Sequence, residues 1–436
     1  MNTDRPGQIR LDDLAEPIYP AAAVPMRQAL AGYGATLELT PEAFLHTAID
    51  RTGLHNWGDT AFTERLDVLC AALGDEAELS DVGTAVVFEQ LVGNLVNRLR
   101  LEDLIGHHPE IGDVRIERPI IICGLPRTGT THLHNLIAAD PAIRYLPYWE
   151  SLEPVATPGE ADPQARRDRC AAGLDLVDTT MPEFKRMHDM TVDHAHEEIQ
   201  LLANDIAGML FETTYYLPSF AAHYKTHDQT ASYAYLKRTL QALQWLRGGG
   251  ASTRWVLKSP QHLEQFPALT ATFPDATFVV THRDPVEVTV SMTTMISYAA
   301  RMGCEHPDPV KISRYWFDRA DDLLTGCLRD RDVLPADQSI DVRFEDFMAD
   351  EEGTIAGIYE LAGQPLDTRA RQAMSCFRGE HPRGRHGGVR YRPADLGLDP
   401  EAIAARLRDY RDRFVAESAQ QGSCVRSHFR RGDPAP

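Results

Sequence analysis

The feature that most constrains the fold is a glycine-bounded loop, Gly124-Leu-Pro-Arg-Thr-Gly-Thr-Thr131, which directly follows the apolar run Ile120–Cys123. An apolar run, such a loop and the helix-compatible stretch 132–139 together predict a strand, a phosphate-binding loop and a helix. This arrangement directs backbone N–H groups and the positive end of a helix at an anion. The glycines have the spacing of a P-loop, but Thr130 stands where that motif has its lysine. The loop therefore predicts a phosphate site that is not built for nucleoside triphosphates.

From about residue 118 onward, short apolar runs alternate with helical stretches, the pattern of a parallel sheet covered by helices on both faces. Strands are predicted at Ile120–Cys123, Ile143–Leu146, Trp255–Leu257, Thr277–Thr281 and Ser339–Phe344. The predicted fold class is α/β, a P-loop-like parallel sheet of about five strands flanked by helices. Ligands of such sheets bind at the carboxyl ends of the strands.

The pattern also predicts a division of the chain. Residues 1–115 are predicted as a helical section packed on the core, because apolar residues recur there at helical spacing. Residues 116–436 are predicted to form the main domain, with a helical insertion at about 152–250 that could build a lid or an acceptor pocket. Further helices are predicted at 182–214, 229–247 and 395–420.

Composition excludes several classes of function. The 436 residues carry 64 acids and 44 bases, a net charge of −20, which disfavours binding to nucleic acid or to anionic membranes. No apolar run approaches the ~20 residues of a membrane span, and the first residues lack the apolar core of a signal peptide. Seven scattered cysteines without a Cys-x-x-Cys pair fit reduced thiols and a cytoplasmic location.

A second polar cluster lies in the segment 278–291. The predicted strand ends at His282 and Arg283, and Asp284-Pro285 supplies an N-cap and a first helical residue. Arg283 is thus expected at the same sheet edge as the phosphate loop, with Ser291 about two turns along the helix. Taken alone, Arg283 could equally form an ion pair with a carboxylate, and Ser291 could be a packing residue.

Together, the two clusters resemble the sulfotransferase family, which transfers a sulfuryl group from 3′-phosphoadenosine 5′-phosphosulfate (PAPS). The matching features are the Pro-Arg-Thr-Gly-Thr-Thr loop and a strand ending in Arg-Asp-Pro with a serine eight residues after the arginine. The resemblance implies that the loop binds the 5′-phosphosulfate and that Arg283 and Ser291 bind the 3′-phosphate. The implied loop ligands are Pro126, Arg127, Thr128, Gly129, Thr130 and Thr131.

The loop arginine is similar to that of the tyrosylprotein sulfotransferases and of bacterial sulfotransferases. The segments Leu257-Lys-Ser-Pro-Gln-His-Leu263 and Phe273-Pro-Asp-Ala276 also resemble the bacterial branch. The resemblance implies that Lys258, at the end of a predicted strand, stabilises charge near the sulfuryl group, together with Arg127. A metal is not expected, because sulfuryl transfer needs none and no complete ligand set is evident.

Sulfuryl transfer requires a base that removes the proton of the acceptor hydroxyl. The resemblance favours Glu150, which lies 23 residues after Arg127. His196 and Glu197 are the alternatives, in the run 193–198. On the predicted helix, His194 and Glu198 would share one face.

The segment 378–392 holds five arginines, two histidines and four glycines in a strongly acidic chain. It could be a solvated basic loop. The resemblance instead implies a flexible loop that closes over the 3′-phosphate, and Arg385 is the residue chosen from it.

The predicted activity is PAPS-dependent transfer of a sulfuryl group to a hydroxyl of a small, apolar acceptor. The apolar residues of the insertion suit such an acceptor, although they also suit an ordinary core; they are Phe184, Met187, Met190, Leu201, Leu202, Met209, Phe211, Tyr215 and Tyr216. The alternatives are a P-loop kinase or nucleotidase, which would need magnesium and ATP, and a non-catalytic nucleotide-binding module.

Overall fold

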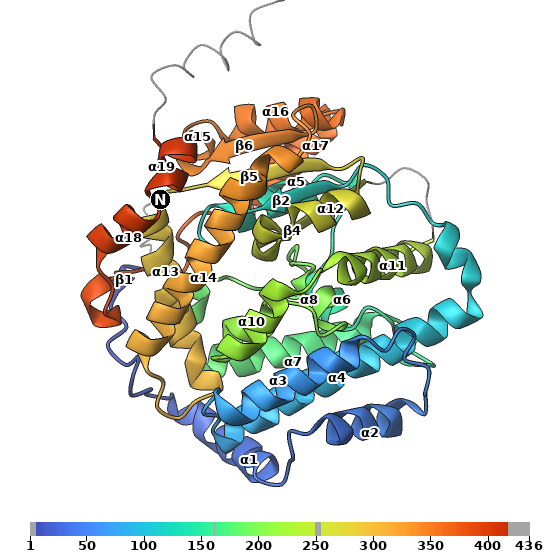
Figure 1. The fold of residues 1–436 in the computed structure, drawn as a ribbon. Helices are drawn as coiled ribbons and strands as arrows, with labels where there is room; N and C mark the ends of the chain where they lie inside the picture. Colours follow the sequence, from blue (N-terminus) through green and yellow to red (C-terminus); the bar gives the residue numbers. More distant parts are fainter. Residues whose placement is uncertain (1–5, 161, 249–253, 417–436) are drawn as a thin grey trace, which may run out of the picture.

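The computed structural model describes residues 6–160, 162–248 and 254–416. Its centre is a parallel five-stranded sheet in the order β3-β4-β2-β5-β6 (Figure 1). The strands are β2 (Ile120–Cys123), β3 (Ile143–Arg144), β4 (Arg254–Ser259), β5 (Thr277–His282) and β6 (Ser339–Arg343). The predicted α/β class and all five predicted strands are confirmed.

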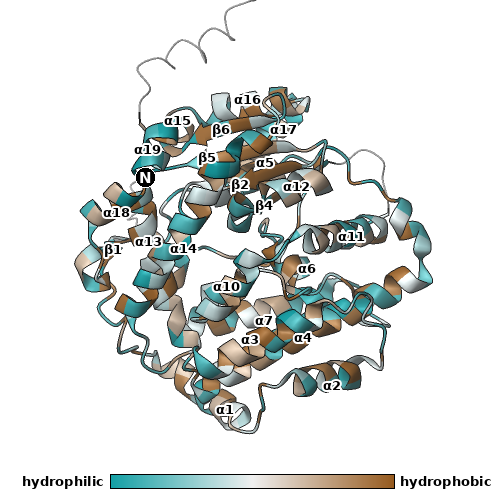
Figure 2. Ribbon diagram, in the orientation of Figure 1, coloured by the Kyte–Doolittle hydropathy of each residue, from teal (hydrophilic) through white to brown (hydrophobic). Residues whose placement is uncertain are grey.

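Alternate residues of β2 face opposite sides of the sheet, and each side is covered by helices. Ile121 and Cys123 pack in one core with apolar residues of α11 (Thr230–Leu246), α12 (Phe266–Thr272), α13 (Pro285–Ala299) and α14 (Pro309–Asp330). Ile120 and Ile122 pack in the other with α5 (Thr130–Ala138), α15 (Phe344–Ala349), α16 (Glu351–Ala362) and α17 (Thr368–Glu380). The apolar ribbon of the central strands is visible in Figure 2. Burial on both faces explains why these strands read as apolar runs.

The N-terminal helices form a layer at the end of the molecule away from β6 (Figure 1). They are α1 (Val24–Gly34), α2 (Pro41–Thr52), α3 (Phe62–Asp75) and α4 (Asp81–His107). Thr40 and Ser80 cap α2 and α4, each accepting a hydrogen bond from an N–H three residues later. The core of this layer also contains Ala203, Ile206, Phe211, Leu217 and Phe220 from the insertion. The N-terminal layer and the insertion therefore share one core.

The insertion contains α6 (Tyr148–Leu152), α7 (Gln164–Thr180), α8 (Ile199–Ala203), α9 (Leu210–Thr214), α10 (Pro218–Thr226) and α11. The helix predicted at 229–247 is confirmed as α11. The helix predicted at 182–214 is wrong, because residues 187–198 contain no helix. Tertiary hydrogen bonds hold this stretch instead: Ala195 N–H donates to Asn135 Oδ1, and His196 N–H donates to the Leu146 carbonyl. His194 and Glu198 consequently do not share a helix face.

The amphipathic helix predicted at 395–420 is also interrupted. Gly397 has a φ of +63°, and two short helices follow it, α18 (Pro400–Arg406) and α19 (Arg408–Phe414). A positive φ suits glycine and ends the turn before it. Residues 417–420 of the prediction lie outside the described residues, as does Cys424.

None of the described helices is long and apolar enough to cross a bilayer. A small two-stranded parallel sheet joins β1 (Gln8–Ile9) to β7 (Gly388–Val389). This pairing ties the start of the described chain to the basic segment 378–392.

Candidate active site

A cavity of about 1050 Å³ opens where β2, β4 and β5 end. One part of its wall is polar and comes from the phosphate loop, from Arg283 and from the basic segment 381–391. The remainder comes mainly from the insertion and from α13, and it combines apolar residues with the polar side chains of the stretch 188–200. The predicted position of a ligand at the carboxyl ends of the strands therefore coincides with the cavity.

The phosphate loop turns tightly between β2 and α5. Gly129 has a φ of +86° immediately before Thr130, the first residue of α5, and Arg127 has a φ of +75°. A left-handed arginine is strained, and such strain concentrates at functional sites. A Cβ on Gly124 would collide with the Thr281 hydroxyl, so the loop requires glycine there.

Most of the predicted loop ligands line the cavity, namely Pro126, Arg127, Gly129, Thr130 and Thr131. Thr128 differs, because its hydroxyl donates to the Leu125 carbonyl and lies 2.7 Å from the Thr281 hydroxyl on β5. The Thr128 side chain thus fastens the loop to the sheet and does not line the cavity.

The two sequence clusters meet at this loop. Arg283 Nη1 donates to the Arg127 carbonyl at 2.8 Å, and Arg127 Nε donates to Ser291 Oγ at 3.0 Å. The guanidinium of Arg127 also contacts the Met187 carbonyl and the Tyr391 hydroxyl. One ligand could therefore reach both the loop and the tip of β5.

Two further contacts hold the Arg283 guanidinium in place, and one of its N–H groups has no partner among the described residues. Its guanidinium lies 4.1 Å from the Phe344 ring centre, and Nη2 donates to the exposed carboxylate of Glu287 at 2.7 Å. Within the described residues, its buried Nε has no hydrogen-bond partner. An unsatisfied buried donor is costly, so this arrangement favours an anion at Arg283.

Lys258 lies at the end of β4 with its side chain only 3% exposed. Its Nζ forms an ion pair with Glu197 and lies 3.5 Å from the Thr131 hydroxyl. Thr131 and Glu197 both line the cavity. The structure thus brings the strand-end lysine, the phosphate loop and one of the alternative bases together.

The neighbouring Glu198 anchors this group. Its carboxylate accepts hydrogen bonds from Lys258 N–H at 2.8 Å and from His262 at 2.6 Å, and Tyr233 lies 2.8 Å from the other nitrogen of His262. Burial acts to raise the pKa of Glu198, but the hydrogen bonds and the charge of His262 outweigh it and lower the pKa. The ionised, buried carboxylate of Glu198 therefore fixes its own segment, including the neighbouring Glu197, against the backbone of Lys258. Its role was not anticipated from the sequence.

Comparisons with known proteins agree with this geometry. Residues 119–368 match the model of the sulfotransferase family. The chain belongs to the sulfotransferase family.

Two solved structures resemble this sulfotransferase over most of its length. Sulfotransferase STF1 from Mycobacterium tuberculosis H37Rv is 31% identical, with a TM-score of 0.75 over 85% of this chain and 98% of that one. Sulfotransferase STF9 from Mycobacterium avium is 26% identical, with a TM-score of 0.75 over 88% of this chain and 98% of that one. No curated protein matches the chain. The protein is therefore a transferase of sulfuryl groups. This conclusion excludes the kinase, the nucleotidase and the non-catalytic binding module that the sequence left open.

Glu150 of the sulfotransferase lies away from the cavity wall. Its side chain is 6% exposed, does not line the cavity, and forms a two-pronged ion pair with Arg247. Arg247 also donates to the Tyr145 carbonyl at 3.1 Å, which joins α11 to the end of β3. This geometry gives Glu150 a structural role, and its role as the base stays a prediction.

Of the six described histidines that line the cavity, three lie in the stretch 188–196, and burial makes these three weak bases. Burial lowers the pKa of His188 to about 3 and lowers the pKa of His194. Burial, followed by the nearby His194, lowers the pKa of His196 well below its usual value. His194 Nε2 and His196 Nδ1 lie 2.8 Å apart, so one imidazole donates to the other. The low pKa of His196 disfavours it as a base, whereas Glu197 lies at the cavity wall beside Lys258.

The basic segment forms part of the cavity wall, with residues 381–389 and Tyr391 lining the cavity. Arg385 lies there, and its Nε donates to Asp189 Oδ2 at 2.9 Å. This ion pair connects the segment to the non-helical stretch 187–198 across the cavity.

The apolar wall of the cavity is rich in methionine. Its lining includes Met181, Met187, Met190, Met209, Met295 and Met302, together with Phe184 and Trp316. Of the nine residues suggested for an acceptor pocket, Phe184, Met187, Met190 and Met209 line the cavity. Leu201, Leu202, Phe211 and Tyr215 are buried in the core, and Tyr216 packs against Tyr315.

Proposed function

We propose that this sulfotransferase moves a sulfuryl group from PAPS to the hydroxyl of a small, apolar acceptor. One observation carries the proposal: a single cavity joins an anion-binding wall to a methionine-rich wall, with Lys258 and Glu197 beside the phosphate loop. Polar and apolar ligands could thus meet at one point. Ligand pockets combine apolar walls with a few placed polar groups in this way.

For the donor, backbone N–H groups of the loop and the start of α5 would hold the 5′-phosphosulfate. Arg283 and Ser291 would hold the 3′-phosphate, with Arg385 closing over the nucleotide. Because Arg127 reaches Ser291 at 3.0 Å, we assign its guanidinium to the 3′-phosphate as well as to charge on the donor. PAPS fits this wall, since its two phosphate groups need separate clusters of donors.

For the chemistry, an acceptor oxygen attacks the sulfur as the bond from sulfur to the bridging phosphate oxygen breaks. Glu197 takes the hydroxyl proton, and adenosine 3′,5′-bisphosphate leaves. Lys258 would donate from Nζ to the oxygens on which charge develops. Charged donors that face such oxygens in a water-poor site supply much of an enzyme's rate enhancement.

For the acceptor, the methionines are the main argument. Methionine is apolar, unbranched and flexible, so a wall of methionines adapts to ligands of different shape. Methionine side chains offer a sugar no strong hydrogen-bond donor or acceptor. We therefore expect a compact lipid, polyketide or phenol.

The test is transfer of labelled sulfate from PAPS to a panel of phenols, fatty alcohols, sterols and sugars. We expect product with at least one apolar alcohol and little with sugars. Sugars as the best substrates would refute the apolar acceptor, and failure with all acceptors and no affinity for adenosine 3′,5′-bisphosphate would refute the donor.

Replacing Arg283 by alanine should weaken the binding of adenosine 3′,5′-bisphosphate by roughly 10–100-fold, because a charged hydrogen bond contributes about 1.5–3 kcal/mol. Isothermal titration calorimetry measures the change. Arg406→Ala is the matched control, since Arg406 lies outside the cavity lining, where it pairs with Asp318 and Asp321 and stacks on Phe317. Equal affinities in the Arg283→Ala and wild-type proteins would contradict the site.

A further inference from the structure

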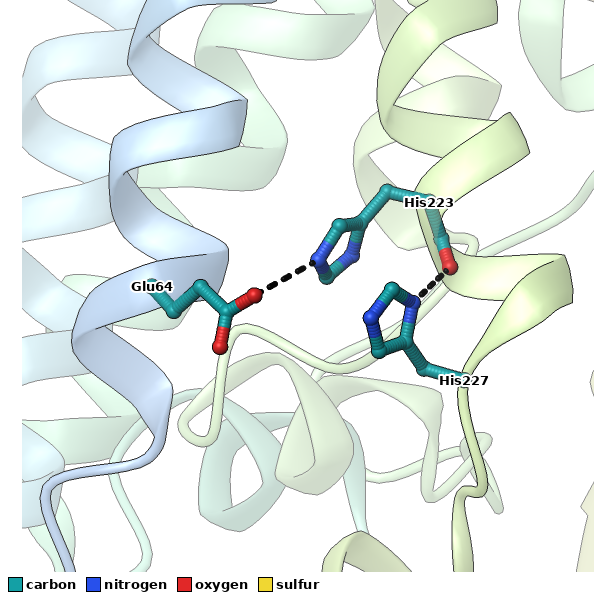
Figure 3. A group of neighbouring side chains, drawn as sticks. All are labelled: Glu64, His223 and His227. Atoms are coloured by element: carbon teal, nitrogen blue, oxygen red, sulfur yellow. Dashed lines mark hydrogen bonds and ion pairs between the residues drawn. The ribbon is translucent and has the colours of Figure 1, made fainter.

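Away from the cavity, three side chains with metal-ligating atoms converge between α3 and α10 (Figure 3). They are Glu64 on α3, His223 in the last turn of α10, and His227 directly after that helix. One ligand atom of each lies within 4.8 Å of the other two. From this geometry we infer a binding site for a divalent transition-metal ion of the zinc type, separate from the sulfuryl-transfer site.

The His227 ring stacks on the His223 ring, with centres 3.8 Å apart, and its hydrogen bond is of the kind that metal ligands make. Its Nδ1 lies 2.7 Å from the His223 carbonyl oxygen and so carries the proton that it donates there. Nε2 is then unprotonated and available to a metal. Metal-ligating histidines commonly donate a hydrogen bond from the nitrogen that does not bind the metal to a backbone carbonyl, which fixes the orientation of the ring.

His223 provides a second, independent indication. Its Nε2 is buried, lies 3.5 Å from Glu64 Oε1, and has no hydrogen-bond partner within the described residues. Two ligands of a tetrahedral zinc ion, each about 2.0–2.1 Å from the metal, lie roughly 3.3 Å apart. The observed separation is close to that value, so an ion between the two groups would satisfy both of them.

The three ligands also define the kind of ion. Two imidazoles and one carboxylate suit zinc, nickel or copper, whereas magnesium and calcium prefer an all-oxygen shell. The Glu64 side chain is 73% exposed, so it can adjust to complete the site, and the fourth position is open to water. The chain's net charge of −20 adds a general attraction for cations.

A bound ion would link the N-terminal layer to the insertion. The core of α3 already includes Phe220 of α10, so the two helices are held close together before the metal arrives. An ion that binds only the folded protein raises its melting temperature. The expected consequence is therefore a zinc-dependent gain in stability.

The test uses the full, untagged chain, from which a chelator has removed any bound metal. Titration with zinc chloride should show one equivalent bound per chain and a higher Tm, whereas magnesium chloride should produce neither effect. No stoichiometric binding of zinc to the wild-type protein would overturn the proposal.

The variants His223→Gln, His227→Gln and Glu64→Gln should each weaken zinc binding by at least about tenfold, since even loss of an outer partner of a ligand costs roughly 10–100-fold. Glu64→Gln changes an exposed side chain and does not threaten folding. The control is the double variant His107→Gln, His108→Gln, which removes two exposed histidines near Asp103 and Glu110 at the end of α4. Zinc affinity that persists in the site variants, or that falls equally in the control, would refute the site.

Discussion

Replacing Lys258 with alanine is expected to lower kcat by about 10²–10³-fold, the usual cost of removing one donor to the oxygens on which charge develops. The reason lies in its position, buried at the end of β4 and in contact with both Thr131 and Glu197. Because the alanine variant keeps the loop and Arg283, its affinity for adenosine 3′,5′-bisphosphate should change far less than kcat. Steady-state kinetics and calorimetry on the same preparations separate the two quantities.

Lys237→Ala is the control for this variant, since Lys237 Nζ donates to the Thr272 carbonyl, away from the cavity. Its kcat should stay near that of the wild type. Removal of Lys258 also leaves the Glu197 carboxylate without its partner, so the Tm of each variant is measured as well. A folded Lys258→Ala enzyme with the wild-type kcat would exclude the proposed role.

The second large effect is expected in Glu197→Gln, which keeps the shape of the side chain but removes the base. Proton transfer by a placed base contributes about 10²–10⁴-fold, so kcat should fall by a factor in this range. The loss should be smaller for acceptors with acidic hydroxyls, such as nitrophenols, because they need less help in losing the proton. Rates across a series of phenols of graded pKa measure this dependence.

Two variants distinguish Glu197 from the other carboxylates. Asp193→Asn removes another acid of the cavity lining, whose carboxylate forms an exposed ion pair with Arg167, and it should retain most activity. Glu150→Gln breaks a buried ion pair, so it should lower the Tm but spare kcat in the protein that remains folded. A large loss of kcat in a stable Glu150→Gln protein, with full activity in Glu197→Gln, would return the role of base to Glu150.

The parts of the fold that the sequence predicted correctly are those that follow from a local pattern of residues. The apolar run Ile120–Cys123 and the glycine of the left-handed turn specify β2 and the loop within a dozen residues. Asp284 and Pro285 likewise specify the start of α13, and Asp284 accepts from Val286 N–H as an N-cap does. Parallel topology then brings the ends of these strands to one edge, so Arg283 could be placed near the loop without coordinates.

The structure of the segment 182–198 could not be predicted from its local sequence pattern. Its composition suits a helix, but its backbone hydrogen bonds go to Asn135 and Leu146, which lie far away in the sequence. Tertiary partners of this kind override a local preference. The error mattered for function, because it decides which acids of this stretch face the cavity.

The sequence by itself thus determined the sheet, the glycine-bounded loop and the family, since these depend on short motifs, each of which is made of residues close together in the chain. Only the tertiary structure showed that Glu150 pairs with Arg247 whereas Glu197 faces the cavity, and only it separated the cavity wall from the core in the insertion. The physical reason is that a carboxylate takes its role from its partner. Arg247 is 97 residues from Glu150, and Lys258 is 61 from Glu197. Such pairings are set by how the helices pack, which no local pattern in the sequence records.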